Sequence, residues 1–134
     1  MKKILTTMLC LLTTMTAMAD VVFPKVSTDS EEYWYFIQMQ RGGAVLASQG
    51  EGANLKTATA SKTAKQTQLW KVTKDGTRYK LTSKGGQVLY YDYTTGVPES
   101  SRFHTSATPP TGKGYFSSFQ IVETTNSTFE GYEI

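Results

Sequence analysis

Residues 36–46 read FIQMQRGGAVL, and residues 79–89 read YKLTSKGGQVL. The two stretches lie 43 residues apart and align without a gap. Identical residues occupy four aligned positions: Gly42/Gly85, Gly43/Gly86, Val45/Val88 and Leu46/Leu89. A Gly pair between two β-prone runs is typical of a hairpin turn, because glycine adopts positive φ without strain. The chain is therefore predicted to contain two copies of one β unit.

The repeat extends beyond the Gly-Gly turns. Residues 54–58 match residues 102–106, and residues 69–72 match residues 118–121. Each copy is predicted to hold four short strands in about 40–48 residues, with a large aromatic residue in the last strand. Trp70 fills that position in the first copy, and Phe119 fills it in the second.

No segment after residue 32 has a convincing helical period, and short β-prone runs alternate with Gly, Asn and Asp turns. The predicted strands are 34–40, 44–48, 54–58, 68–73, 78–83, 87–93, 102–106 and 117–123. Residues 57–65 lack an apolar stripe and are predicted to form a loop. The fold class is therefore predicted to be all-β.

The N-terminus has the pattern of a secretory signal peptide. Lys2 and Lys3 precede an apolar run, and Ala17-Met18-Ala19 gives small residues at the two positions that signal peptidase reads. Residues 1–19 are predicted to be a cleaved leader, and residues 20–32 a linker or N-terminal arm. The mature chain is expected in the periplasm, at the cell surface or outside the cell. No other segment has the roughly 20 apolar residues that a membrane span needs.

The net charge and the numbers of Cys and His residues argue against several classes of partner and site. Without the leader, the chain has 12 basic and 11 acidic residues and a net charge of +1, which argues against nucleic acid as the partner. Its one Cys, Cys10, lies in the leader, which excludes a disulfide scaffold and a Cys metal site from the mature chain. Its one His, His104, makes a histidine metal site or a Ser–His–Asp triad improbable. We expect no catalytic residues, no metal and no cofactor.

Gln68-Leu69-Trp70 closes the first copy as a Q-x-W tripeptide. With the Gly-Gly turns and the four-strand period, this motif resembles the ricin B-type lectin β-trefoil, in the divergent form found in secreted proteins of Bacteroidetes. The resemblance implies lobe one at residues 33–75, lobe two at 76–125 and the start of a third lobe at 126–134. It also implies that Trp70 and Phe119 fill the barrel, while the Gln68 amide holds loop backbone.

The chain departs from that family in two ways. Ala47 and Tyr90 stand where the sugar-binding lobes carry an Asp, so the family's sugar contact does not transfer. The third lobe is represented by its opening strand alone, which predicts an incomplete barrel and self-association through exposed strand edges. The apolar side chains expected at the uncovered face are Phe36, Leu46, Trp70, Leu89 and Phe119.

The strongest binding candidates are Tyr91, Asp92 and Tyr93, because sugars bind through apolar faces on aromatic rings and hydroxyls bonded to carboxylates. The alternative is that these tyrosines are ordinary strand residues. Gln49 and Asn54 lie in the corresponding loop of lobe one, where Ala47 favours an empty site.

Two further side chains have open assignments. Trp34 is either an exposed stacking platform or, as we favour, a buried residue. His104 is predicted to point outward into solvent.

These features predict a secreted, non-catalytic, lectin-like module that binds a glycan weakly and accompanies a downstream catalytic domain, or is a truncated remnant of such a protein. A secreted protein–protein interaction domain on a trefoil scaffold is the alternative. A hydrolase that uses Glu51 and Asp92 is a third and weaker hypothesis, since nothing in the sequence places the two carboxylates together.

Overall fold

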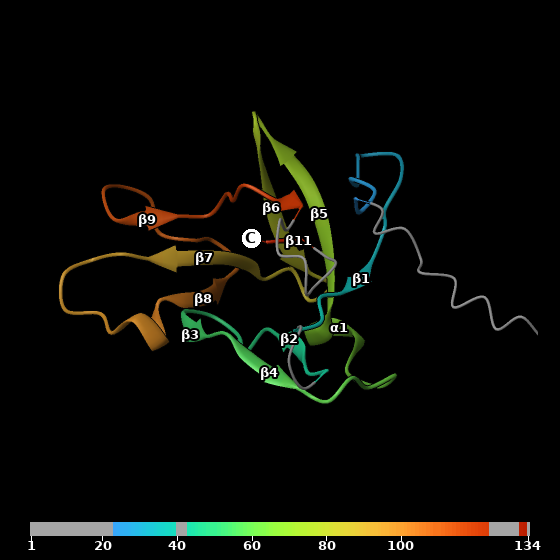
Figure 1. Cartoon of the computed structure of the whole chain (residues 1–134), viewed down its shortest axis with the longest axis horizontal. Helices are drawn as coiled ribbons and strands as arrows, with labels where there is room; N and C mark the ends of the chain where they lie inside the picture. The colour runs from blue at the N-terminus through green and yellow to red at the C-terminus, as the bar shows by residue number, and fades with distance from the viewer. Residues whose placement is uncertain (1–22, 40–42, 124–131, 134) are drawn as a thin grey trace, which may run out of the picture.

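A computed structural model describes residues 23–39, 43–123 and 132–133, and these residues confirm the all-β prediction (Figure 1). The strands are β1 Tyr35–Phe36, β2 Val45–Ala47, β3 Ala53–Asn54, β4 Lys56–Ala58, β5 Leu69–Asp75, β6 Arg78–Ser83, β7 Val88–Asp92, β8 Phe103–Ser106, β9 Tyr115–Phe116, β10 Val122–Glu123 and β11 Tyr132–Glu133. In these described ranges two short helices, α1 Lys65–Gln68 and the 3-10 helix η1 Glu99–Ser101, lie between strands. The leader, residues 1–19, lies outside the described residues.

Most strands belong to one antiparallel sheet with the order β1-β5-β6-β7-β8-β3, and β9 pairs with β7. The strands β2 and β4 form a separate pair, as do β10 and β11. The long hairpin of β5 and β6 stands across the molecule in Figure 1, and β7, β8 and β9 extend away from it to one side. The sequence did not predict β9 or the single turn of α1, both of which are shorter than five residues.

Strand pairing repeats between the two sequence copies. The second and third strands pair in each copy, through Val45↔Ala58 in one and Val88↔Ser106 in the other. The first strand pairs with the last in each copy as well, through Tyr35↔Trp70 and Tyr79↔Phe119. The pairing of β5 with β6 joins the last strand of one copy to the first strand of the next.

The gapless alignment of the two first strands is wrong by one residue. Met39 donates its backbone N–H to Ala44, and the equivalent bond in the second copy runs from Ser83 to Gln87. Four residues separate the first pair and three separate the second. Tyr35 therefore corresponds to Tyr79, and Phe36 does not. Because the alignment was matched on the shared Gly-Gly pair, it is displaced by one residue in the strand that precedes the turn.

The core lies between the two copies and takes side chains from both. Trp70, with 0% of its surface exposed, packs among buried residues from β2, β5, β6, β7 and the segment before β10. These are Leu46, Val72, Leu81, Leu89 and Ile121. Phe23, Ile37, Leu55, Tyr79 and Phe119 pack around them.

The N-terminal arm, of which residues 23–32 are described, docks on the sheet. Ser27 is buried and its backbone N–H donates to Val72 at 2.7 Å. The Ser27 hydroxyl accepts from the Tyr33 backbone at 2.9 Å, and the Phe23 ring lies 5.2 Å from that of Tyr79. The arm therefore contributes to the edge of the core.

The expectation of an uncovered apolar face is wrong, because most of the five side chains expected there are covered. Leu46, Trp70 and Leu89 are buried, and Phe119 is half-buried against them. Phe36 alone of the five is exposed, at 44%. These residues are covered in part by the docked N-terminal arm, whose Phe23 packs on the core and which a count of lobes leaves out.

Candidate functional site

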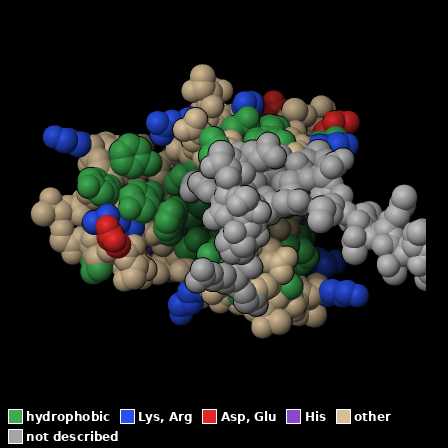
Figure 2. All heavy atoms as spheres, viewed as in Figure 1, with side chains coloured by type: hydrophobic (Ala, Val, Ile, Leu, Met, Phe, Trp, Pro, Cys, Tyr) green, Lys and Arg blue, Asp and Glu red, His purple; other side chains and the backbone are tan. Residues whose placement is uncertain are grey.

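An aromatic surface occupies the end of the molecule formed by β7, β8 and β9. Four residues make it up and are called the aromatic platform from here on: Tyr91, Tyr93, Phe103 and Phe116. The rings of Tyr91 and Tyr93 stack with centroids 6.3 Å apart, and Phe103 meets Tyr91 edge-on at 4.9 Å. Tyr93, Phe116 and Phe103 are 60%, 49% and 38% exposed. Figure 2 shows hydrophobic side chains gathered on this side of the molecule.

The platform continues the core-facing side of the sheet. Side chains alternate along β7, so Tyr91 shares a face with buried Leu89, and its cross-strand partners Phe103 and Phe116 share that face too. Phe103 lies 6.2 Å from Phe119, which packs on the core. The same alternation that fills the core therefore presents aromatic rings to solvent where β7 and β8 extend past it.

Arg102 provides the polar edge of the platform. Its guanidinium lies 4.8 Å from the centre of the Tyr93 ring and donates to the Tyr91 hydroxyl at 3.3 Å. The Nε atom donates to the Val97 carbonyl at 3.3 Å, and Glu99 pairs with Arg102 at 3.6 Å. The bond to the Tyr91 hydroxyl, reinforced by nearby negative charge, raises the pKa of Arg102. The arginine is therefore a fixed cation at the platform.

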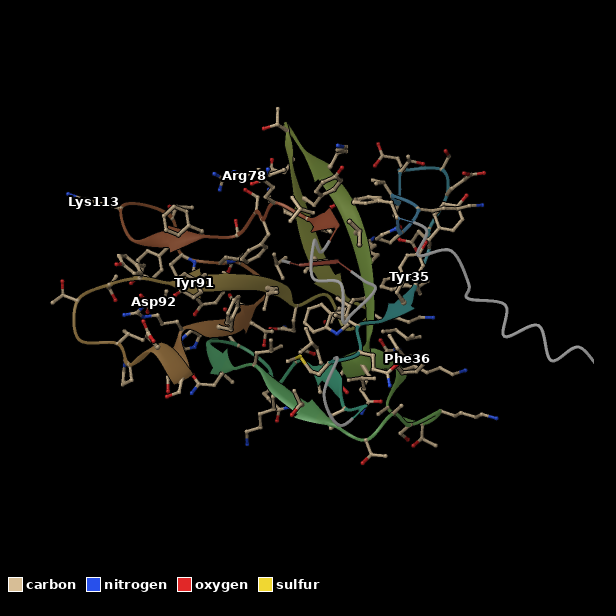
Figure 3. All side chains as sticks on the ribbon, in the orientation of Figure 1. Tyr35, Phe36, Arg78, Tyr91, Asp92 and Lys113 are labelled. Atoms are coloured by element: carbon tan, nitrogen blue, oxygen red, sulfur yellow. The ribbon has the colours of Figure 1, made fainter. Side chains whose placement is uncertain are left out.

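Asp92 does not join the two tyrosines that flank it. Alternation along β7 turns its side chain to the opposite face, and Figure 3 shows its position beside Tyr91 on that strand. Its Oδ1 accepts from the Thr94 hydroxyl at 2.6 Å and the Thr94 backbone N–H at 2.8 Å, and these bonds lower the pKa of Asp92. Grouping Tyr91, Asp92 and Tyr93 as one site is thus corrected, because consecutive strand residues face opposite ways.

The face that carries Asp92 also carries His104. The imidazole stacks on Tyr90 with centroids 5.3 Å apart, and its Nδ1 lies 3.2 Å from the Gly52 carbonyl. His104 is half-buried, so the prediction of a solvated side chain is wrong. Burial beside Asp92 and Glu51 raises the pKa of Tyr90. This face packs its ring systems against each other and differs in character from the platform.

Two loop residues of the first copy, Glu51 and Asn54, lie on the His104 face of β8, whereas the Gln49 backbone N–H donates to the Thr105 hydroxyl on the other face at 3.4 Å. Gln49 folds back so that its Nε2 donates to the Ser48 carbonyl at 3.1 Å. Asn54 is exposed and pairs across the strands with His104. Glu51 accepts from the Ser106 hydroxyl and from the Ala107 backbone N–H at 2.8 Å, and these bonds lower its pKa.

The Q-x-W residues hold structure together. Gln68 is buried, its Oε1 accepts from the Ser61 backbone at 2.8 Å, and its Nε2 donates to the Thr59 carbonyl at 3.0 Å. Trp70 Nε1 donates to the Leu46 carbonyl at 3.1 Å. Every polar atom of the two side chains therefore has a partner, as burial demands.

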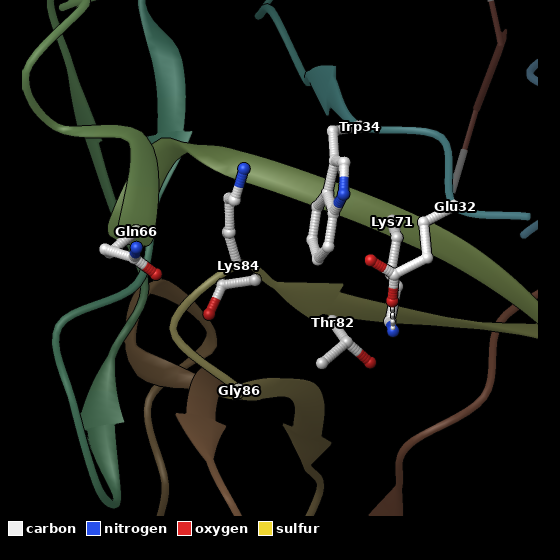
Figure 4. A pocket seen from close by; sticks show the side chains of 8 residues that line it. Glu32, Trp34, Gln66, Lys71, Thr82, Lys84 and Gly86 are labelled. Carbon is white, nitrogen blue, oxygen red and sulfur yellow. Dashed lines mark hydrogen bonds and ion pairs between the residues drawn. The ribbon is translucent and has the colours of Figure 1, made fainter.

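A second surface feature was missed at the sequence level. Trp34 is half-buried and lines an open hollow of about 330 Å³, the Trp34 hollow, so the prediction that it is buried is wrong (Figure 4). The hollow is lined by Glu32, Trp34, Gln66, Lys71, Thr82, Ser83, Lys84 and Gly86. The sequence feature that could have indicated this hollow is the Lys-Gly-Gly turn at residues 84–86, which places Lys84 beside Trp34.

Within the described residues, no cluster of three or more His, Cys, Asp or Glu side chains is arranged to hold a metal ion. The same part of the chain contains no helix with the length and apolar character that crossing a membrane requires. Glu51 and Asp92, the pair considered for hydrolysis, are each tied to local backbone and hydroxyl groups.

Comparison with known proteins gave no significant match to a family model, to a curated protein or to a solved structure.

Proposed function

We propose that the protein is a secreted, non-catalytic carbohydrate-binding module, and that the aromatic platform is its binding surface. The observation that carries the proposal is the cluster of exposed rings with a fixed arginine at its edge. Monomeric proteins rarely expose several large apolar side chains side by side unless the surface binds something. Half of the six most exposed large hydrophobic residues in the described chain belong to this cluster.

The proposal includes a β-trefoil scaffold of the ricin B lectin type. In that fold each lobe pairs its first strand with its last and joins its two middle strands in a hairpin. Both copies in this chain repeat that pattern through equivalent residues. Lobes one and two at residues 33–75 and 76–125 and a third lobe starting at 126–134 remain the proposed division, and residues 126–131 and 134 lie outside the described part.

The platform suits the chemistry of a sugar. The C–H face of a pyranose ring stacks on an aromatic ring, and Tyr93 and Phe116 are the most exposed rings in the cluster. Arg102 supplies N–H donors for hydroxyl groups beside Tyr93. A single small platform with few polar contacts predicts weak affinity, roughly millimolar to high micromolar.

The biological setting is proposed along with the function. A leader at residues 1–19 would export the chain to the periplasm, the cell surface or the exterior. There, a weak binding module would hold a linked downstream catalytic domain near its polysaccharide by raising the effective concentration.

A protein partner is the second candidate. Two of the four platform residues are phenylalanines, which have no polar tip, and an arginine sits among the rings. Aromatic residues with arginine are typical of the energetically important centre of protein–protein interfaces. Self-association through this surface belongs to the same alternative.

A titration followed by NMR separates these functions. A panel of neutral and acidic oligosaccharides is added to labelled protein, and shifts are expected at Tyr91, Tyr93 and Phe116. Tyr93→Ala is expected to weaken binding by about tenfold, since one stacking or charged contact is worth about 1–3 kcal/mol. Asp92→Ala is expected to keep most of the affinity, because Asp92 faces away from the platform.

Phe36→Ala is the matched control, since Phe36 is an aromatic residue of similar exposure outside the platform. Equal losses in Phe36→Ala and Tyr93→Ala would contradict a platform site. Shifts confined to residues 49–54 would move the site to the first copy. Concentration-dependent shifts at the platform without any glycan would favour the interaction-domain alternative.

A further inference from the structure

The Trp34 hollow is built from four parts of the chain that converge on one indole ring. Trp34 precedes β1, Lys71 lies on β5, Lys84 lies in the turn after β6, and Gln66 lies in α1. The ammonium groups of Lys71 and Lys84 lie 5.3 Å and 5.4 Å from the centre of the Trp34 ring. Figure 4 shows the indole standing between the two lysines. A volume of about 330 Å³ accommodates one sugar residue.

The backbone around the hollow is held in place. Lys84 donates its backbone N–H to the Leu69 carbonyl at 2.8 Å, and Gly85 donates to the Gln66 carbonyl at 2.7 Å. A Cβ on Gly85 would lie 3.1 Å from that Gln66 oxygen, so the close approach depends on glycine. The backbone of the turn that carries Lys84 is therefore fastened to β5 and to α1.

The two lysines interact with Glu32 to different extents. Lys71 pairs with Glu32, Nζ to Oε1 at 2.6 Å, and this bond lowers the pKa of Glu32. The salt bridges found among the described residues do not include Lys84, whose ammonium contacts the Trp34 face instead. Two cations and one anion line the hollow, which leaves a net charge of +1. The charge of Lys84 also lowers the pKa of Glu32, but less than that of Lys71 does, so Lys84 is the less neutralised of the two cations that an incoming anion meets.

We infer that the Trp34 hollow binds the anionic group, carboxylate or sulfate, of an acidic glycan. Lys84 contacts the anion, the Trp34 ring supplies an apolar wall for the sugar, and Thr82 and Gln66 supply neutral hydrogen-bonding groups. Glu32 weakens the site by neutralising Lys71. The glycan nature of the ligand rests on the proposed function, whereas the hollow itself is distinct from the platform.

Trp34 provides the readout. The protein contains two tryptophans, and Trp70 is fully buried, so a ligand-induced change in tryptophan emission reports on Trp34. The probes are an oligogalacturonate, a sulfated galactan and an uncharged galactan of similar length. The two acidic probes are expected to change the emission and the uncharged one is not. A response to one acidic probe and not the other assigns the anion as carboxylate or sulfate.

Substitutions of opposite sign test the mechanism. Lys84→Gln is expected to weaken binding of the acidic probe by about tenfold or more, since it removes a charged hydrogen bond. Glu32→Gln is expected to strengthen binding because it releases Lys71. Lys56→Gln is the matched control, an exposed lysine on β4 away from the hollow. Equal losses in Lys84→Gln and Lys56→Gln, or no change in both hollow variants, would overturn the inference.

Tyr93→Ala separates this inference from the proposed function. Lys84-dependent binding that survives Tyr93→Ala supports the hollow whether or not the platform binds glycans. Loss of acidic-probe binding in Tyr93→Ala but not in Lys84→Gln overturns the hollow and leaves the platform as the site. Inorganic sulfate that reproduces the full emission change at the same concentration would overturn the glycan part of the inference.

Discussion

At the scale of single residues, Trp70 is the side chain on which most of the structure depends. It is fully buried, contacts core residues from both copies, and donates to the Leu46 carbonyl. Trp70→Ala is expected to lower the free energy of unfolding by about 3–5 kcal/mol, because it removes a large buried ring and leaves a cavity. Urea denaturation followed by circular dichroism measures the loss.

Two companion variants test the reason for that loss. Trp70→Phe keeps a buried ring but leaves the Leu46 carbonyl without its donor, so it is expected to cost less than the alanine variant. Phe36→Ala removes an exposed ring and is expected to change stability by about 0.5 kcal/mol or less. A Trp70→Ala protein as stable as the Phe36→Ala protein would contradict the central role of Trp70.

The sequence predicted the role of a residue best where the size and polarity of its side chain allow only one environment in the folded chain. A tryptophan that closes a repeat unit has few places to go except the core, and a neighbouring glutamine must find backbone partners there. Asp92 and Trp34 were harder to assign. The Asp92 carboxylate is held within its own turn by a hydrogen bond from Thr94, which the residue type alone does not reveal. Trp34 is half-exposed because its ring is covered by two lysine side chains and not by the core.

At the scale of elements, the loop before β3 is fastened to β8 through Glu51. Its carboxylate accepts from Ser106 and Ala107, which holds its pKa below the usual 4.5. A carboxylate with a depressed pKa contributes stability above its unfolded-state pKa and loses it as pH falls through the folded-state value. The melting temperature is therefore expected to fall on acidification below about pH 4.5.

Glu51→Gln isolates this contribution. The variant is expected to melt lower than the parent near neutral pH, and the gap is expected to narrow as the pH falls below the usual carboxyl range, because Glu51 of the parent then becomes protonated and loses its charged bonds. Thermal melts near neutral pH and below that range measure the gap. Asp29→Asn serves as the control because it changes an exposed carboxylate in the arm. A gap of constant size would show that the Glu51 charge does not matter to this junction.

Element boundaries illustrate what a repeat can and cannot predict. The predicted strand at 78–83 matches β6, and the pairing of the middle strands follows the alignment of the two copies. The alignment of the first strands is displaced by one residue because it was set by identical glycines. The pairing partners that fix the true register lie far away in sequence. Short elements such as β9 depend on a neighbouring strand, β7, and have little signal of their own.

At the scale of the whole molecule, the two copies share one core. Trp70 and Val72 come from the first copy, and Leu81, Leu89 and Ile121 come from the second. Neither set is buried without the other, so the protein is expected to unfold in one cooperative step. Tryptophan emission, which reports the first copy, and NMR signals of Tyr90, which report the second, are expected to give the same midpoint.

Two separate midpoints would show that the copies are independent domains. The platform variant Tyr93→Ala is expected to leave the common midpoint nearly unchanged, because that ring is mostly exposed. The unfolding experiment, which tests for a single transition, and the binding experiment on Tyr93→Ala can therefore be interpreted independently.

The unequal Gly-Gly turns carry a lesson for protein engineering. The first turn holds one residue more than the second, yet the pairs that flank the two turns are equivalent, Gln38↔Val45 in the first copy and Thr82↔Val88 in the second. A one-residue insertion inside a strand would instead rotate every following side chain to the other face. The first turn is thus a natural place to graft a peptide tag, a fluorophore site or a display epitope. An insertion between Met39 and Ala44 is expected to leave the strand register on either side unchanged, and neither of these two residues belongs to the platform or lines the Trp34 hollow.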